Sequence, residues 1–304
     1  MRRIKLLAYL VIVHTFIFVL FATWGSFPQL IVHNYNSSYG FSCISPVHNH
    51  TSNIPRHIHQ MFFNMTDKTI PERLEKARKT WINNHPHFEY TLWNSTMVEN
   101  LIDKSYPQLR DLYHSYSHWV RRADMGRYIV LHEFGGIYID LDIKSSGKHL
   151  IELYQTFKNT TGVVLYLTNP PVVSNDFMIS KSKHPFMKHV LCGLESAKRW
   201  YVLPYVTTMF TTGPMYLHAQ YKSYSKKHEI ELLEEPVMKQ FVRHITGSSW
   251  HQWDGVIIWW IFLHVKQVLI GSAVTLFLAL TLTLLWKYRS IVLKCCKQQT
   301  LRKC

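Results

Sequence analysis

Two uncharged apolar runs bracket a central region in which hydrophobic and polar residues alternate over short distances. The first run covers residues 6–24, where His14 is the only titratable side chain, and the second covers residues 267–286. About 20 apolar residues span the hydrocarbon core of a bilayer, so each run predicts a transmembrane helix. A cleaved signal peptide is the alternative for the first run, but its apolar stretch would be only about 7–15 residues long. A buried core helix is the alternative for the second, but the length and the following Lys287 and Arg289 favour a span.

The central region shows both of the hydrophobic periods that mark regular structure. Phe88, Tyr90 and Leu92 alternate with polar neighbours, as in a half-buried strand, whereas Ala77 and Trp81 lie four apart, as on one face of a helix. Together the patterns predict strands over 57–63, 88–93, 137–143 and 162–167, and helices over 71–83 and 118–134, with Gly135-Gly136 stopping the second helix. Strands that alternate with helices indicate an α/β sheet.

Positive charge is concentrated at the two ends of the chain. Of the net charge of +15, residues 1–5 contribute +3 and residues 287–304 contribute +6, and neither end contains an acid. Basic residues that flank membrane spans stay on the cytosolic side, so we expect both termini in the cytosol and the middle of the chain in a lumen. This placement indicates membrane insertion and not nucleic-acid binding. The hydrophobic content of 47% excludes a disordered chain.

These features divide the chain into seven predicted segments. They are a cytosolic tail (1–5), a transmembrane signal anchor (6–24), a lumenal stem (25–53), a folded domain (54–254), an interfacial apolar segment (255–266), a second transmembrane helix (267–286) and a basic cytosolic tail (287–304). Five Asn-x-Ser/Thr sequons lie between the two spans and suit a lumenal location, at Asn36, Asn49, Asn64, Asn94 and Asn159. Only Cys43 and Cys192 are expected in the lumen, where a disulfide and two free thiols are both open alternatives.

The most informative polar pattern joins an acid–base pair on the second predicted helix to two acids on the strand that follows it. Asp124 and Arg127 are three apart and would share a helix face, and Asp140 and Asp142 would point to one side of the strand. Like charges so close together are costly unless a cation lies between them, and hard oxygen ligands suit Mg²⁺ or Mn²⁺. Taken singly, an Asp-x-Asp pair usually marks a solvated strand end and an Asp–Arg pair a surface ion pair. The ordered combination is much more specific.

This combination resembles the Asp-x-Asp glycosyltransferases, and in particular the family that contains the fungal inositol phosphorylceramide mannosyltransferases and the initiating α-1,6-mannosyltransferase of the yeast Golgi. The resemblance covers about residues 54–254. Further similar blocks lie at 54–60, 82–93, 174–178, 184–186, 212–214 and 244–251. It implies an α/β fold, namely a GT-A (Rossmann-like) glycosyltransferase domain, here placed between two transmembrane helices.

The resemblance also implies roles for individual residues. Asp140 and Asp142 would hold the metal, with His251 as a third ligand or, alternatively, as a surface histidine. Asp124 and Arg127 would grip hydroxyl groups of the donor sugar. The donor-binding set is completed by Ile58, His59, Gln60, Trp93, Asn175, Ser249 and Trp250, and Asp176 joins the four charged residues of the motif as a catalytic candidate.

The activity implied by the resemblance is a retaining, metal-dependent transfer of mannose from GDP-mannose to inositol phosphorylceramide, with Mn²⁺ or Mg²⁺ as cofactor. In a front-face transfer the leaving phosphate takes the acceptor proton, so no separate nucleophile is required. Trp250, Trp253, Trp259 and Trp260 cluster just before the second span, and tryptophan favours the membrane interface. We expect an interfacial segment that holds the site against the lumenal leaflet and so favours a lipid acceptor. A tryptophan cluster that only anchors the helix is the alternative. A membrane regulatory subunit is also implied as a partner.

Two other functions are open alternatives. One is a Golgi hexosyltransferase that acts on glycoprotein glycans with another nucleotide sugar, although a soluble acceptor would not require a second span. The other is a catalytically inactive membrane adaptor, against which the intact charged residues of the motif argue. The expected location is the Golgi membrane, with the endoplasmic reticulum as the alternative.

Overall fold

The computed structural model describes Ile44 and residues 53–63, 69–157, 162–169, 171–245 and 253–301. The chain divides into two compact units, one formed by Pro28–Asp254 and the other including Gly255–Cys304. The first unit contains the mixed sheet and its helices, and the second contains the long C-terminal helix.

A six-stranded sheet forms the centre of the first unit, with the strand order β2-β1-β3-β6-β5-β7. Its strands are β1 (His57–Met61), β2 (Glu89–Trp93), β3 (Gly136–Ile139), β5 (Val163–Leu167), β6 (Val173–Ser180) and β7 (Ile230–Glu234). β1 pairs in parallel with β2 and β3, and β5 pairs in parallel with β7, whereas β6 runs antiparallel to both β3 and β5. The predicted α/β sheet is therefore confirmed, with one antiparallel strand in a mainly parallel sheet.

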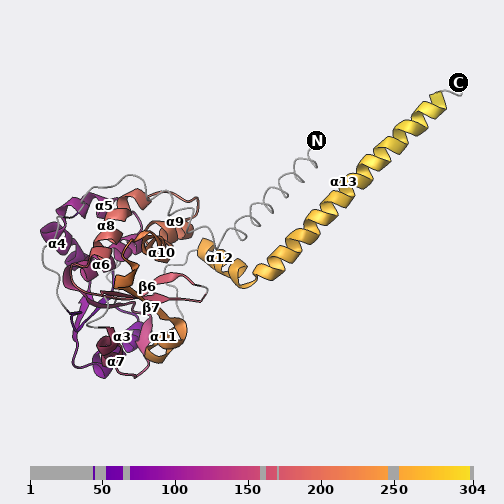
Figure 1. Ribbon diagram of the computed structural model, residues 1–304. Coiled ribbons are helices and arrows are strands. Elements are labelled where there is room, and N and C mark those ends of the chain that lie inside the picture. Colours follow the sequence, from indigo (N-terminus) through magenta and orange to yellow (C-terminus); the bar gives the residue numbers. More distant parts are fainter. Residues whose placement is uncertain are drawn as a thin grey trace. The chain divides into compact units, whose positions relative to one another are not determined.

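Helices cover both faces of this sheet (Figure 1). One face carries α4 (Ser95–Ser105), α6 (Trp119–Phe134), α8 (Pro185–Ala197) and α10 (Pro214–Ser223), and the other carries α3 (Glu72–Asn84), α7 (Leu150–Phe157) and α11 (Glu235–Phe241). Successive strand residues enter opposite cores, since Tyr138 packs with the first group and Ile137 and Ile139 with the second. Burial on both faces explains why these strands are almost wholly apolar. The shorter helices are η1 (Pro107–Leu109), α5 (Arg110–Ser115), α9 (Pro204–Thr211) and η2 (Lys227–Glu229).

Two glycines end α6 and turn the chain into β3. Gly135 and Gly136 have φ values of 67° and 91°, a region that residues with side chains rarely adopt. A Cβ at Gly135 would lie 2.5 Å from the backbone nitrogen of Ser182, and a Cβ at Gly136 would lie 2.5 Å from the carbonyl oxygen of His57. The predicted Gly-Gly stop is confirmed, and it brings β3 directly against β1.

The prediction of one strand over 137–143 is wrong. β3 ends at Ile139, and a separate strand, β4 (Ile143–Ser145), pairs with β8 (Val242–His244) in a second, two-stranded sheet. Between the two strands, the backbone nitrogen of Ile143 donates to the carbonyl oxygen of Asp140 at 3.1 Å, which closes a turn. Asp140 and Asp142 therefore lie on a turn that follows the carboxyl end of β3, and not on one side of a strand.

The other predicted elements are confirmed within two residues at each end. Strands 57–63, 88–93 and 162–167 correspond to β1, β2 and β5, and helices 71–83 and 118–134 correspond to α3 and α6. Such small differences at element ends are expected, because terminal turns and strand ends are only weakly specified by sequence.

Cys192, in α8, is disulfide-bonded. The free-thiol alternative is therefore wrong for this residue. Ile44, the neighbour of Cys43 in sequence, is buried in the same core cluster against which Cys192 packs. A pair between Cys43 and Cys192, one of the two alternatives from the sequence, stays a prediction.

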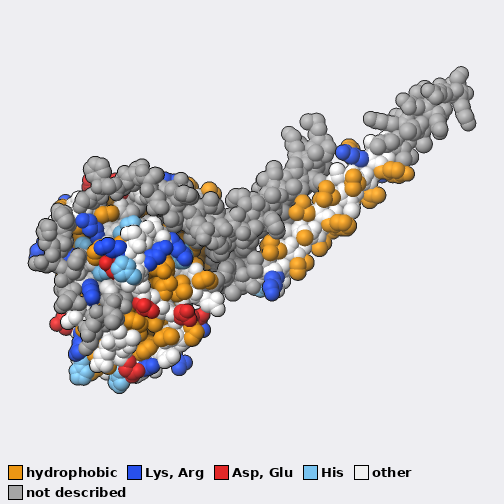
Figure 2. Space-filling model, viewed as in Figure 1, with side chains coloured by type: hydrophobic (Ala, Val, Ile, Leu, Met, Phe, Trp, Pro, Cys, Tyr) orange, Lys and Arg blue, Asp and Glu red, His pale blue; other side chains and the backbone are white. Residues whose placement is uncertain are grey.

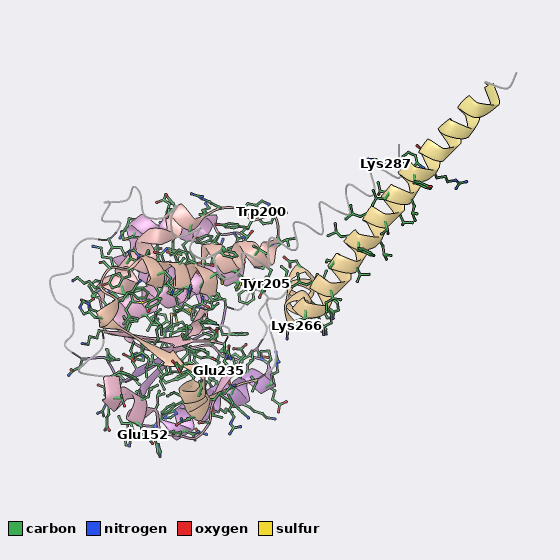
Figure 3. The ribbon with its side chains drawn as sticks, turned by 45° about the vertical axis from the view of Figure 1, so that its right-hand side comes forward. Glu152, Trp200, Tyr205, Glu235, Lys266 and Lys287 are labelled. Atoms are coloured by element: carbon green, nitrogen blue, oxygen red, sulfur yellow. The ribbon has the colours of Figure 1, made fainter. Side chains whose placement is uncertain are left out.

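In the second unit, the long helix α13 (Val265–Leu301) follows α12 (Trp253–Leu263). Within the described part of the chain, one segment, Lys266–Ser290, is long and apolar enough to cross a membrane, with a mean hydropathy of 2.4 over an 18-residue stretch of it. Its hydrophobic side chains are exposed along the helix, with Lys266 at one end and Lys287 at the other (Figures 2 and 3). Two transmembrane helices were predicted; the first, over 6–24, lies outside the described residues.

Of the five sequons, Asn94 alone falls within the described residues. Its side chain is exposed, and its oxygen accepts a hydrogen bond from the backbone nitrogen of Met97 at 2.8 Å, which caps α4. The amide nitrogen to which a glycan would attach takes no part in this cap, so glycosylation at Asn94 stays a prediction.

Candidate functional site

A cavity of about 290 Å³ lies in the first unit, at the carboxyl ends of β1 and β3. It is bounded by residues 61–63 after β1, by the start of α3, by the first half of α6, by the turn at 140–142 and by the junction between α9 and α10. Five of the predicted site residues line it, namely Asp124, Arg127, Asp140, Asp142 and Asn175. In sheets of this type, ligands bind at the carboxyl ends of the parallel strands.

Arg127 is the centre of the polar network in this cavity. Its Nη2 lies 3.2 Å from Asp124 Oδ1, and its Nη1 lies 3.3 Å from the carboxylate of Asp140 and donates to the carbonyl oxygen of Asn175 at 2.8 Å. The guanidinium is buried and also lies over the ring of Tyr138, 4.9 Å from its centroid. One side chain of α6 therefore connects the turn after β3 to β6, which fixes the position of the first acid of the motif.

Asp124 has hydrogen-bond partners on both of its oxygens. Oδ1 accepts from Asn175 Nδ2 at 3.0 Å, and Oδ2 accepts from Thr212 Oγ1 at 2.7 Å. Burial raises the pKa of Asp124, and the neighbouring Arg127, Thr212 and Asn175 oppose this shift by stabilising the carboxylate. Tyr128, one turn along α6, donates to the carbonyl oxygen of Thr212 at 2.7 Å. The 212–214 block thus holds Asp124 in place and lines the cavity through Gly213 and Pro214.

Three carboxylates near the turn, Asp140, Asp142 and Asp176, are close enough for their charges to influence one another, and one histidine lies beside them. Burial, then the charges of Asp142 and Asp176, raise the pKa of Asp140 against the opposing effect of Arg127. Burial and Asp176 likewise raise the pKa of Asp142. His244, at the end of β8, lies 2.8 Å from Asp176 Oδ2, and this hydrogen bond raises the pKa of the imidazole. Tyr138 donates to Asp140 Oδ1 at 2.7 Å.

These carboxylates fit the prediction of a divalent cation. Their mutual repulsion would be relieved by a cation bound between them, and Asp176 Oδ1 is buried with no hydrogen-bond partner among the described residues. Within that described part of the chain, no three His, Cys, Asp or Glu side chains converge as a complete metal site. His251, the predicted third ligand, lies outside it, as do Ser249 and Trp250.

Four residues predicted to bind the donor do not line the cavity, namely Ile58, His59, Gln60 and Trp93. Ile58 is buried in the core on the side of α3. His59 accepts from Trp93 Nε1 at 3.2 Å and, through its Nε2, bonds the carbonyl oxygen of Gly135 at 2.9 Å. Gln60 donates to the carbonyl oxygen of Asp140 at 3.2 Å. The same strand reaches the cavity only with the following residues, 61–63.

Three polar residues that sequence reasoning did not select contribute to the network. Tyr138 precedes the motif by two residues, Thr212 begins the 212–214 block, and His244 begins the 244–251 block. Thr212 and His244 belong to sequence blocks that resemble the glycosyltransferase family, so their positions in these blocks could have marked them as site residues. Tyr138 carried none, because it reads as an ordinary apolar strand residue.

Comparison with known families gives the class to which this domain belongs. Residues 71–157, from α3 to the end of α7, match the family model described as "Glycosyltransferase sugar-binding region containing DXD motif". This range includes Asp124, Arg127, Asp140 and Asp142. The chain therefore contains the sugar-binding region of the DXD glycosyltransferases, and the resemblance noted in the sequence is confirmed.

The similar proteins include fungal inositol phosphoceramide mannosyltransferases. The chain is 36% identical over 211 residues to "Mannosyl phosphorylinositol ceramide synthase CSH1" of Saccharomyces cerevisiae, covering 66% of this chain and 54% of the relative. It is 34% identical over 233 residues to "Inositol phosphoceramide mannosyltransferase 2" of Schizosaccharomyces pombe, covering 72% and 64%. The alignments thus span only about half to two thirds of these relatives' lengths. A solved structure, "PaToxG Glycosyltransferase", aligns with a TM-score of 0.44 at 16% identity over 68% of this chain and 80% of that one, too weakly to carry an argument.

Proposed function

We propose that the chain is a membrane-anchored retaining glycosyltransferase with a GT-A domain, and that it transfers mannose from GDP-mannose to inositol phosphorylceramide at the Golgi membrane. The observation that carries the proposal is the buried Arg127 bridge between Asp124 and Asp140, placed in a cavity at the carboxyl ends of β1 and β3. The identity of 36% to a mannosyl phosphorylinositol ceramide synthase supports the choice of sugar and acceptor.

The acids of the turn would hold a divalent cation, Mn²⁺ or Mg²⁺. Asp140 and Asp142 line the cavity, and the buried, unpaired Oδ1 of Asp176 belongs to the same group of carboxylates. When bound, the cation supplies positive charge opposite the diphosphate of the donor. Tyr138 and Arg127 hold the Asp140 carboxylate from two sides, so its orientation is set before any ligand arrives.

Arg127 is the residue best placed to bind the donor sugar. Its Nη atoms are engaged by Asp124, Asp140 and the Asn175 carbonyl, but its Nε is buried with no hydrogen-bond partner among the described residues. A buried donor without a partner is costly, so a sugar hydroxyl that accepts from Nε would bind with a net gain. Asp124 acts mainly by holding the guanidinium, since both of its oxygens are already engaged.

The transfer breaks the bond between C1 of mannose and the diphosphate oxygen and forms a bond between C1 and an acceptor hydroxyl oxygen on the same face. The proton of that hydroxyl passes to the leaving diphosphate. No protein nucleophile is needed in this step, and the side chain of Asp176 is already paired with His244 through Oδ2. The chain's contribution is to orient the two substrates and to stabilise the charge that develops on the leaving group.

A lipid acceptor agrees with the rest of the chain. The Lys266–Ser290 segment would anchor the domain in the membrane in which a ceramide lipid resides. The domain would face the lumen, with both termini in the cytosol, as the basic tails predict. A membrane regulatory subunit would be a further partner.

The test is a transfer assay with the full chain in membranes that contain inositol phosphorylceramide, Mn²⁺ and a panel of labelled nucleotide sugars. The proposal predicts labelled mannose on the ceramide lipid from GDP-mannose, lost in Asp142→Ala and kept in Asp111→Ala, which changes an exposed acid on α5. Transfer to glycoprotein glycans, or from another nucleotide sugar only, would contradict it. Absence of both nucleotide binding and turnover would favour an inactive adaptor.

A further inference from the structure

The loop between α8 and α9, residues 198–203, carries the two most exposed large hydrophobic side chains that the structure describes in the Pro28–Asp254 unit. Trp200 is 65% exposed and Val202 is 78% exposed. The other exposed large hydrophobic side chains among the described residues of this unit are all below 40%. Two large apolar side chains that are mostly exposed and only two positions apart on one loop make this loop the strongest candidate for an interaction surface on the unit.

The backbone conformation of the loop explains why these two side chains are exposed. The backbone nitrogen of Leu203 donates to the carbonyl oxygen of Tyr201 at 2.6 Å, which encloses Val202 in a three-residue turn with a φ of 65°. A β-branched residue in this region is strained, so neighbouring contacts must hold it there. Tyr201 provides them, because its backbone nitrogen donates to Thr207 Oγ1 at 3.0 Å and its ring lies 5.5 Å from that of Phe210. The chain is thus anchored at Tyr201, while the residues on either side point outward.

The charge of the loop suits an anionic lipid surface. Lys198 and Arg199 directly precede Trp200, and both are exposed. No ion pair involving either of them occurs between described residues. Tryptophan is enriched at the interface between bilayer and water, and basic residues beside it bind anionic headgroups. A protein partner would equally accept the apolar side chains, but it would not by itself require the two basic residues.

The loop lies next to the point where the chain leaves the domain and also next to the cavity. The backbone nitrogen of Tyr205, in the first turn of α9, donates to Asp254 Oδ2 at 2.8 Å. Asp254 is the last residue of this unit and the second residue of α12, the helix through which the chain continues toward α13. On the same helix, Thr208 lines the cavity. Only four residues separate Thr208 from Pro204, about 6 Å along the helix axis. Trp200 and Tyr205 are labelled in Figure 3.

We propose that residues 198–203 form a membrane-binding loop, in which Trp200 and Val202 enter the headgroup region of the lumenal leaflet and Lys198 and Arg199 bind anionic headgroups. The loop is a second attachment, separate from the membrane helix. Because α9 joins the loop to the cavity wall, this attachment holds the cavity at the lipid surface, where a lipid headgroup reaches it without leaving the bilayer. The inference rests on the proposed anchorage and lipid acceptor.

The first test measures the position of the loop and does not depend on activity. The full chain is placed in nanodiscs of phosphatidylcholine and phosphatidylserine, with an environment-sensitive fluorophore on Trp200→Cys or, as the control, on Ile82→Cys, an exposed position on α3. Labelling of the native cysteines is subtracted with the unsubstituted protein. A lipid carrying a nitroxide on its headgroup is expected to quench the label at position 200 and to leave the label at position 82 unchanged.

The opposite pattern would overturn the proposal. If a water-soluble quencher reaches both labels equally and the lipid quencher reaches neither, the loop is free in solvent. If neither quencher reaches position 200, protein covers the loop. These results are obtained even if the chain transfers no sugar, so failure of the loop and failure of the proposed activity are distinguishable.

A second test separates a positional role from a structural one. The double variant Trp200→Ser/Val202→Ser is expected to raise KM for the membrane-embedded acceptor about tenfold, because two apolar contacts with the bilayer are lost. KM for the donor should be unchanged. An equal loss toward both substrates, or no change toward the lipid, would contradict the proposal.

Discussion

Arg127 and Asp140 are in direct contact in the lining of the cavity, with Nη1 of the guanidinium 3.3 Å from the carboxylate. This contact links α6 to the turn after β3, two elements that the Gly135-Gly136 corner separates along the chain. The buried guanidinium of Arg127 therefore orients Asp140, the first acid of the Asp-x-Asp motif. The second acid, Asp142, lies further along the same turn.

The first prediction concerns this contact. Arg127→Ala leaves the buried carboxylate of Asp124 and the partly buried carboxylate of Asp140 without the guanidinium that pairs with them, so we expect a loss of about 3–5 kcal/mol in the free energy of unfolding and no measurable transfer. Arg127→Lys keeps the charge but not the two-sided geometry, and should recover stability better than activity. Chemical denaturation and the transfer assay measure the two effects. Equal recovery of both by lysine would show that charge alone matters.

A second prediction tests the support of Asp124. Thr212→Val removes the hydroxyl that donates to Asp124 Oδ2, and a hydrogen bond to a buried charge is worth about 1.5–3 kcal/mol. We expect destabilisation of that size, with rescue by Thr212→Ser. The adjacent Thr211→Val is the matched control, because its buried hydroxyl bonds only the Thr207 carbonyl within α9. Equal effects at both positions would mean that Thr212 acts through packing.

His244 is expected to give a pH-dependent contribution to stability. Its pKa is raised above the usual value, first by the hydrogen bond to Asp176 and then by the charges of that residue, Asp142 and Asp140. A raised pKa in the folded state means that the pair stabilises fully below about pH 6.5, the unfolded value, and that this contribution is lost as pH rises through the folded value. The difference in unfolding free energy between the wild type and His244→Asn, measured without added metal, should therefore shrink on going to alkaline pH. A constant difference would show that protonation of His244 plays no part.

The buried histidines predict instability in acid. Burial, followed by the charge of His57, lowers the pKa of His59 to about 3, and burial lowers those of His85 and His218 to about 4. Below about pH 6.5 the unfolded chain binds protons that the folded one does not, so each of the three histidines removes up to about 1.4 kcal/mol of stability per pH unit. The thermal midpoint should fall as pH decreases from 6.5 toward 4, and less steeply in His59→Gln. An unchanged slope in this variant would contradict the assignment for His59.

The fold and the site differed in how far the sequence predicted them. Short alternating and four-residue periods predicted β1, β2, β5, α3 and α6, because burial of one face imposes them directly. The chemistry of the motif identified its two acids as site residues, but the backbone conformation at these positions was not predicted correctly. Asp140 and Asp142 continue an apolar run, so a strand was the natural reading, whereas the turn between them depends on tertiary pairing of β4 with β8.

The direction in which each side chain points was the other feature that could not be predicted from the sequence. His59 and Gln60 stand in the strand that reaches the cavity, yet the first is held by Trp93 and Gly135 and the second holds the backbone of Asp140. Thr212 lies 88 residues from Asp124 in sequence. A single chain gives no local signal for such a pairing, because the contact exists only once α9 has packed against α6.

If the proposed function is right, the cavity at the turn binds the nucleotide sugar through a cation held by Asp140 and Asp142. The decisive measurement is calorimetric titration of the full chain in detergent micelles with GDP-mannose, with and without Mn²⁺. We expect binding that requires Mn²⁺, that is lost in Asp142→Ala and that is kept in Asp111→Ala. Binding of equal strength without the metal, or undiminished in Asp142→Ala, would contradict it.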